Sequence, residues 1–147
     1  MFKDVTDKHG GSYCGREHVG RGVAFGELDN DGRVDMVLIP LDEPVAVLKT
    51  IAGQGNHWIG FQLKRKGHRD PVGAKVILEA GGKKQARFAK GGGSYISAND
   101  PRHVFGLGHG DKIDKVTVTW PDLTEQSWED LAVDRYWELI EGEKEAR

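Results

Sequence analysis

The acidic stretch ELDNDGRVD, residues 27 to 35, has the residue types and spacing of a metal-binding loop. A loop that wraps a hard cation needs oxygen ligands on alternate residues, so that successive side chains converge, and a glycine that permits a sharp turn. Gly32 stands where that glycine is needed. The candidate ligands are the side chains of Glu27, Asp29, Asp31 and Asp35 and the backbone carbonyl of Arg33.

Calcium is the cation that this set of oxygens suits best. It accepts roughly 6 to 8 oxygens at about 2.3–2.6 Å, and four carboxylates with a carbonyl and water meet that need. The loop is not an EF-hand, because Leu38 stands where that motif has a bidentate Glu. An acid-rich hairpin, in which Asn30, Asp31 and Gly32 only make the turn, stays open as the alternative. The cost of clustering carboxylates without a countercharge favours the metal.

Short apolar runs on each side must position this loop. Residues 21–28, 34–40 and 44–49 are rich in Val and bounded by turn residues, which is typical of strands. The middle run is apolar on both faces, so we expect it to be covered on both sides. Because three strands need a partner surface for stability, we expect the meander of residues 1–50 to pack on the rest of the chain or on another copy.

The pattern changes after residues 51–55, which we interpret as a linker because they contain glycine and no periodicity. Residues 56–147 form the second predicted domain, in which short runs alternate apolar and polar side chains. A hairpin is predicted at residues 79–85, where two glycines supply positive φ. We therefore predict an all-β fold, with a β-sandwich or barrel within residues 56–141 after a three-strand, propeller-blade-like meander. Its predicted core contains Ile59, Phe61, Leu63, Val76, Leu78, Phe105, Val116, Val118, Trp120, Trp137 and Leu139.

Three aromatic residues support an alternative interpretation as a carbohydrate-binding module. Trp58 and Trp128 stand off the apolar face of their predicted strands, and Tyr95 lies in a Gly-rich segment. If these rings are exposed and coplanar, they would form a platform for sugar rings.

Other classes of function find less support. The net charge is −2 and the basic run at residues 64–69 is short, so we expect no nucleic-acid partner. No apolar run approaches the length of a membrane span, and residues 1–10 lack the core of a signal peptide. Cys14 is the single cysteine and is interpreted as a free loop thiol. Because no constellation of catalytic groups is visible, we expect no enzyme.

Two parts of the chain resemble known families. The stretches FKDVT, GRGVAFGELDNDGRVDMVL and DEPVAVLK are similar to one blade of an FG-GAP (VCBS-type) β-propeller with its calcium loop. The stretches GNHWIGFQL, HRDPVGAKVILEAGG, GGGSYISANDPRHVFGLG and QSWEDLAVDRYWELIEG resemble the ASPIC/UnbV domain. The resemblance implies a calcium-binding, non-catalytic protein that is extracellular or attached to the cell surface, with a protein or glycan ligand that the sequence does not identify.

The chain departs from the resemblance in two places. Glu27 stands where the family usually has Asp, and its extra methylene shifts the ligand oxygen by about 1 Å. On this basis Glu27→Asp is expected to preserve or strengthen calcium binding. The family carries several blades and this chain about one, so we expect self-association or the missing blades of a longer parent. The UnbV name, attached to antibiotic gene clusters, keeps an accessory protein or enzyme of biosynthesis as a further alternative.

Overall fold

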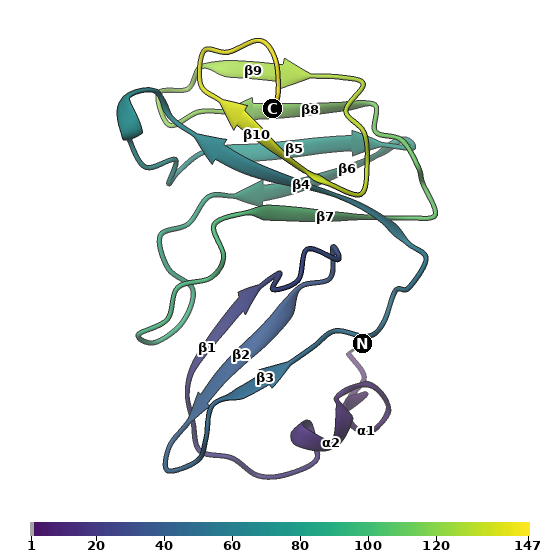
Figure 1. The fold of residues 1–147 in the computed structure, drawn as a ribbon, viewed down its shortest axis with the longest axis vertical. Coiled ribbons are helices and arrows are strands. Elements are labelled where there is room, and N and C mark those ends of the chain that lie inside the picture. The colour runs from purple at the N-terminus through teal and green to yellow at the C-terminus, as the bar shows by residue number, and fades with distance from the viewer. Residues whose placement is uncertain (1) are drawn as a thin grey trace.

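The computed structural model describes residues 2–147, in which short strands predominate (Figure 1). The strands are β1 (Gly20–Gly26), β2 (Asp35–Pro40), β3 (Ala46–Leu48), β4 (His57–Lys64), β5 (Lys75–Ala80), β6 (Lys83–Phe88), β7 (His103–Gly108), β8 (Lys115–Thr119), β9 (Glu125–Trp128) and β10 (Tyr136–Ile140). Helical turns are short: α1 (Thr6–His9), α2 (Gly11–Cys14) and the 3-10 turn η1 (Lys66–His68). The all-β prediction is confirmed.

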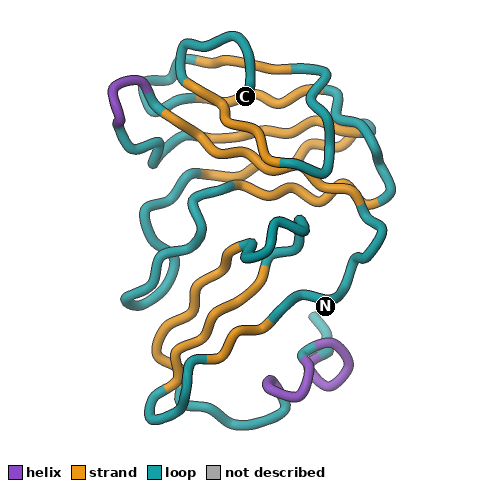
Figure 2. Tube along the Cα trace, viewed as in Figure 1, coloured by secondary structure: helices purple, strands orange, loops and turns teal. Residues whose placement is uncertain are grey.

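The strands form three sheets, two of which make a sandwich. Strands β1, β2 and β3 form an antiparallel sheet, here called the N-terminal meander. The orders β10-β4-β7 and β6-β5-β8-β9 describe the two sheets of the C-terminal sandwich, residues 57–140 (Figure 2). Strand β10 runs parallel to β4, and the other pairs are antiparallel. The two sheets remain separate, so the fold is a sandwich and not a closed barrel.

The core of the sandwich follows the predicted alternation. Ten of the eleven predicted core residues are buried, and Trp137 is partly buried against them. Trp137 pairs with Phe61, so it shares the inward face, but it lies on the edge strand β10 and is covered on fewer sides. Phe61 and Phe105 meet edge to face at the centre, with ring centroids 5.7 Å apart. Fully burying an aromatic or aliphatic side chain contributes about 1.5–3 kcal/mol, so this alternation supplies the main stabilising term.

The structure confirms one predicted turn and differs from the prediction at one short helix. The β5–β6 hairpin is confirmed, with φ of 54° at Gly81 and 73° at Gly82, as a primed turn requires. Cys14, interpreted from the sequence as a loop thiol, instead ends α2, a single helical turn. A four-residue helix is too short for apolar periodicity to reveal it. Within the described residues, no helix has the length and apolar character needed to cross a membrane.

The N-terminal meander packs on the C-terminal sandwich, as expected, but through one end only (Figure 1). The prediction that β2 is covered on both faces is wrong. Ile39 is 49% exposed, and Val47 on β3, which pairs with Val37, is 57% exposed. The physical reason is that the sandwich contacts the edge of β1 and the loop that follows it, and leaves the broad faces of the meander largely open.

Candidate metal centre between the meander and the sandwich

The acidic loop, residues 27–35, joins β1 to β2 and lies against the sandwich. Its backbone turns at Asn30 and Gly32, which have φ of 58° and 81°. Gly32 is needed for a second reason, since a Cβ atom there would lie 2.2 Å from Cδ1 of Trp58 on β4. The backbone of the loop therefore rests directly on the Trp58 indole.

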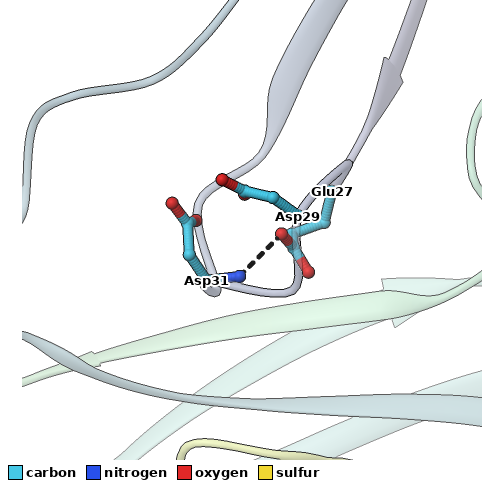
Figure 3. A group of neighbouring side chains, drawn as sticks. All are labelled: Glu27, Asp29 and Asp31. Atoms are coloured by element: carbon cyan, nitrogen blue, oxygen red, sulfur yellow. Dashed lines mark hydrogen bonds between the residues drawn. The ribbon is translucent and has the colours of Figure 1, made fainter.

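Three carboxylates of the acidic loop converge (Figure 3). Glu27, Asp29 and Asp31 each present an oxygen within 4.8 Å of those of the other two. Glu27 is only 2% exposed, whereas Asp31 is half-buried and Asp29 is exposed. The backbone N–H of Asp31 donates to Oε1 of Glu27 at 2.8 Å, which closes the loop on itself. The alternate spacing in sequence thus brings three of the predicted ligands together.

Two cationic side chains lie against the outer acids. Nζ of Lys49 donates to Asp29, and Nη2 of Arg33 donates to Asp31. The hydrogen bond from Lys49 lowers the pKa of Asp29 below its usual value. No ion pair among residues 2–147 reaches the Glu27 carboxylate, which is the most buried of the three converging acids. Arg102 bonds to the backbone carbonyl of Glu27 and not to its side chain. That the backbone carbonyl of Arg33 is a ligand stays a prediction.

Asp35 stands apart from the three converging acids. It is 1% exposed, and its Oδ1 accepts the backbone N–H of Thr50 at 2.8 Å. Its Oδ2 faces the backbone N–H of Leu28 at 3.4 Å. The carboxylate therefore ties the acidic loop to the segment that follows β3. Both oxygens of Asp35 thus already accept hydrogen bonds from backbone groups. A ligand role for Asp35 stays a prediction.

A tyrosine of the sandwich reaches into the acidic loop. The hydroxyl of Tyr136, at the start of β10, donates to Oε2 of Glu27 at 2.9 Å. Burial, and this hydrogen bond to a carboxylate, raise the pKa of Tyr136, so the hydroxyl keeps its proton. The ring packs over Gly60, where a Cβ atom would lie 2.2 Å from it, and meets Trp58 edge to face at 5.0 Å. Tyr136 and Trp58 form the floor on which the loop sits.

Arg102 makes a second connection between the sandwich and the loop. Its Nη2 donates to the backbone carbonyl of Glu27 at 2.6 Å, and its Nη1 donates to Oδ1 of Asn30 at 2.8 Å. The guanidinium lies over the Tyr136 ring, 4.4 Å from its centroid. Asp100 holds it through Nε and Nη2. Burial would raise the pKa of Asp100, but the hydrogen bonds from Arg102 outweigh that and lower it.

Backbone contacts fix the edge of β1 to the segment before β7. The N–H of Asp100 donates to the carbonyl of Phe25 at 2.9 Å, and the N–H of Phe25 donates to Oδ1 of Asn99 at 3.0 Å. The lack of side chains at Gly22 and Gly26 allows this approach, because a Cβ atom would meet Ser97 or Asp100. No local pattern in the sequence indicates these long-range partners, since Asn99 lies 74 residues from Phe25 and Arg102 lies 75 residues from Glu27.

The predicted aromatic platform does not exist. Trp58 is 8% exposed and Trp128 is 5% exposed, while Tyr95 is 64% exposed. Trp58 does lie on the outer face of β4, but the acidic loop covers that face. Trp128 pairs with Val116, which turns its ring into the core. A sugar-binding surface built from these three residues is excluded.

The cluster has the donor chemistry for a hard cation. It offers carboxylate oxygens from alternate residues of one turn, and no sulfur or imidazole ligand belongs to it. Calcium and magnesium prefer such oxygens, whereas zinc favours nitrogen and sulfur. The residues therefore fit the ion that the sequence predicts.

Comparison with known proteins finds sequence similarity over most of the chain. Residues 64–146 match the family model described as "ASPIC and UnbV". Cartilage acidic protein 1 of Xenopus tropicalis is 34% identical over 109 residues, which is 70% of this chain and 16% of that protein. The chain thus spans about one sixth of the length of this relative. The relative matches more of the chain than the family model does, so the similarity extends beyond residues 64–146.

Proposed function

The chain belongs to the ASPIC and UnbV family, and we propose that it is a calcium-binding, non-catalytic β module of an extracellular recognition or adhesion protein. In this proposal the N-terminal meander is an FG-GAP-like blade and the acidic loop is its calcium site. The name of the relative associates it with cartilage, which supports an extracellular setting. The partner recognised is a protein or glycan.

The geometry of the acidic loop supports the metal. Two oxygens that bind one calcium ion at about 2.3–2.6 Å lie no more than about 5 Å apart. The oxygens of Glu27, Asp29 and Asp31 lie within 4.8 Å of one another, so one ion can touch all three without a change of backbone. The larger and more flexible coordination of calcium suits a loop of this kind better than the strict octahedron of magnesium.

The burial of Glu27 is the observation that carries the proposal. A charged carboxylate that leaves water needs a countercharge as well as hydrogen bonds. Glu27 is 2% exposed and has two donors, the Asp31 N–H and the Tyr136 hydroxyl, but it lacks an ion pair within the described residues. The Arg102 guanidinium lies close by but bonds to the backbone carbonyl of Glu27, so a divalent cation at the converging oxygens would supply the direct countercharge that the carboxylate lacks.

Lys49 and Arg33 define the competing interpretation. They neutralise Asp29 and Asp31, as they would in an acid-rich turn that binds no ion. Both pairs are exposed or half-exposed, however, and such pairs contribute at most about 1 kcal/mol. Calcium would displace Lys49 and Arg33 at a small cost in free energy, so these ion pairs do not prevent calcium from binding.

Calorimetry and thermal unfolding test the proposal directly. Extracellular calcium modules bind with Kd of about 10⁻⁴–10⁻³ M, and we expect this range. Calcium at a hundred times Kd would stabilise the fold by about 2.7 kcal/mol. At about 3 °C per kcal/mol for this size of protein, Tm should rise by roughly 8 °C. Asp29→Asn should abolish most of the rise, because it removes one ligand charge.

Asp111→Asn is the matched control, since Asp111 is exposed and lies outside the cluster. It should keep the full response to calcium. Equal melting of the unaltered chain in excess calcium and in excess chelator would mean that Lys49 and Arg33 alone balance an acidic turn, and the proposal would fail.

A further inference from the structure

We propose that Tyr136 and Arg102 of the C-terminal sandwich are positioning residues of the calcium site, so that ion binding and docking of the N-terminal meander strengthen each other. This inference rests on the proposed function and assigns the regulation of the same site. Neither residue belongs to the acidic loop or would touch the ion. They act through Glu27 and the backbone of the loop.

Glu27 is shared between the loop and the sandwich. Its Oε1 accepts the N–H of Asp31 inside the loop at 2.8 Å, and its Oε2 accepts the Tyr136 hydroxyl at 2.9 Å. The Tyr136 ring is fixed by Gly60 below it and Trp58 beside it, so the hydroxyl has little freedom to follow a displaced carboxylate. If the meander leaves the sandwich, Glu27 loses the donor that orients it.

Arg102 fixes the backbone of the same loop. It donates to the carbonyl of Glu27 at 2.6 Å and to the Asn30 side chain at 2.8 Å, so it holds the first and fourth residues of the loop. Asp100 and the Tyr136 ring set the orientation of the guanidinium from the sandwich side. A guanidinium held in this way presents its donors in a rigid fork, which Lys cannot reproduce.

These contacts imply a reciprocal coupling. Groups that orient metal ligands typically change metal affinity by about 10–100-fold when they are altered. By thermodynamic linkage, any factor by which docking strengthens ion binding is the factor by which the ion strengthens docking. Removal of the ion should therefore loosen the contacts between meander and sandwich, including the hydrogen bond from Asp100 N–H to Phe25 O.

Calorimetric titration of the whole chain with calcium tests the coupling. Tyr136→Phe keeps the ring that packs on Gly60 and removes only the hydroxyl, so we expect it to fold and to bind calcium about tenfold more weakly. Arg102→Lys should weaken binding as well. Asp111→Asn is again the matched control, because Asp111 is exposed and lies outside the acidic cluster, and the calcium affinity of this variant should not change.

Glu27→Asp supplies an independent variant. It keeps the charge but shortens the side chain, so it should lose the bond to Tyr136 and bind calcium more weakly. The double variant Glu27→Asp/Tyr136→Phe should then be no weaker than the weaker single variant, since both changes remove the same contact. Additive losses would overturn the assignment of Tyr136 as the partner of Glu27.

Hydrogen exchange gives a readout that does not depend on measuring affinity. Chelation should speed exchange in the peptide that contains Asp100, whose N–H bridges to Phe25, and Tyr136→Phe should show fast exchange even with calcium at the concentration that protects the unaltered chain. If the unaltered chain binds calcium and Tyr136→Phe binds it equally well, the coupling is wrong and the proposed function stands. If the unaltered chain binds no calcium, both are wrong.

Discussion

Gly32→Ala is the substitution that most directly tests how the acidic loop sits on the sandwich. Gly32 has φ of 81°, and its Cα faces the indole of Trp58. An added Cβ atom would lie 2.2 Å from Cδ1 and Cγ of that ring. Carbon atoms pack best at about 3.5–4.0 Å, so either the loop or the ring would have to move by roughly 1.5 Å.

The expected cost has two parts. An L-residue in a left-handed conformation costs about 1–2 kcal/mol relative to glycine. Overpacking typically costs about 1–3 kcal/mol, and here the indole cannot yield, because it is 8% exposed and confined by Tyr136. We therefore expect Gly32→Ala to destabilise the docked state by about 2–5 kcal/mol, mainly by lifting the loop and breaking the bond from Tyr136 to Glu27.

Gly55→Ala separates the two parts. Gly55 has nearly the same φ, 79°, but a Cβ atom there would meet nothing within 4 Å. Urea unfolding followed by tryptophan fluorescence should show that Gly55→Ala loses only the backbone part, and that Gly32→Ala loses about 1–3 kcal/mol more. Equal losses in the two variants would refute the contact between Gly32 and Trp58, and with it the position of the loop.

Two further predictions concern the sandwich. Burial and the nearby Arg87 lower the pKa of His103, so the unfolded chain takes up the proton first as the pH falls below about 6.5. Stability that is present above this pH should decline toward the lower pKa of the folded state; His103→Gln should flatten the decline in urea midpoint, and His109→Gln at the surface should not. Phe105→Ala should cost about 3–5 kcal/mol in urea unfolding because Phe105 is fully buried, whereas Phe88→Ala, 55% exposed, should cost little.

Local pattern explains why most of the sandwich was predictable. Alternation with period two specifies which side chains of a strand face inward, whatever the partner sheet is. Ile59 and Phe61 on β4 and Val116 and Val118 on β8 follow it, and all four are fully buried. The choice between sandwich and barrel did not follow from this pattern, because closure depends on which strands pair and not on which faces are apolar.

The two mispredicted tryptophans show the limit of that reasoning. The pattern placed Trp58 on the outward face correctly, and the error was to equate outward with exposed, since the acidic loop covers that face. The case of Trp128 differs. Its inward position follows from its pairing with Val116, and the register between β8 and β9 is not visible in a single four-residue strand.

In the candidate site, the residues that are close together in the sequence could be predicted, and the long-range partners could not. The convergence of Glu27, Asp29 and Asp31 follows from their alternate spacing within one turn, and the sequence therefore predicted it. Tyr136 and Arg102 were missed because nothing local to either residue indicates its partner. Their contacts exist only because the meander folds back onto the sandwich.

Glu27 shows how a departure from a family pattern acquires a physical reason. Considered within the loop alone, its extra methylene is a defect that displaces a ligand oxygen, and a shorter Asp should be better. In the folded chain the same methylene lets one carboxylate accept the Asp31 N–H at 2.8 Å and the Tyr136 hydroxyl at 2.9 Å together. An Asp at this position would have to give up one of the two. The length of the Glu27 side chain therefore matches the distance from the loop to Tyr136 on the sandwich, so the loop and its docking surface form one structural unit.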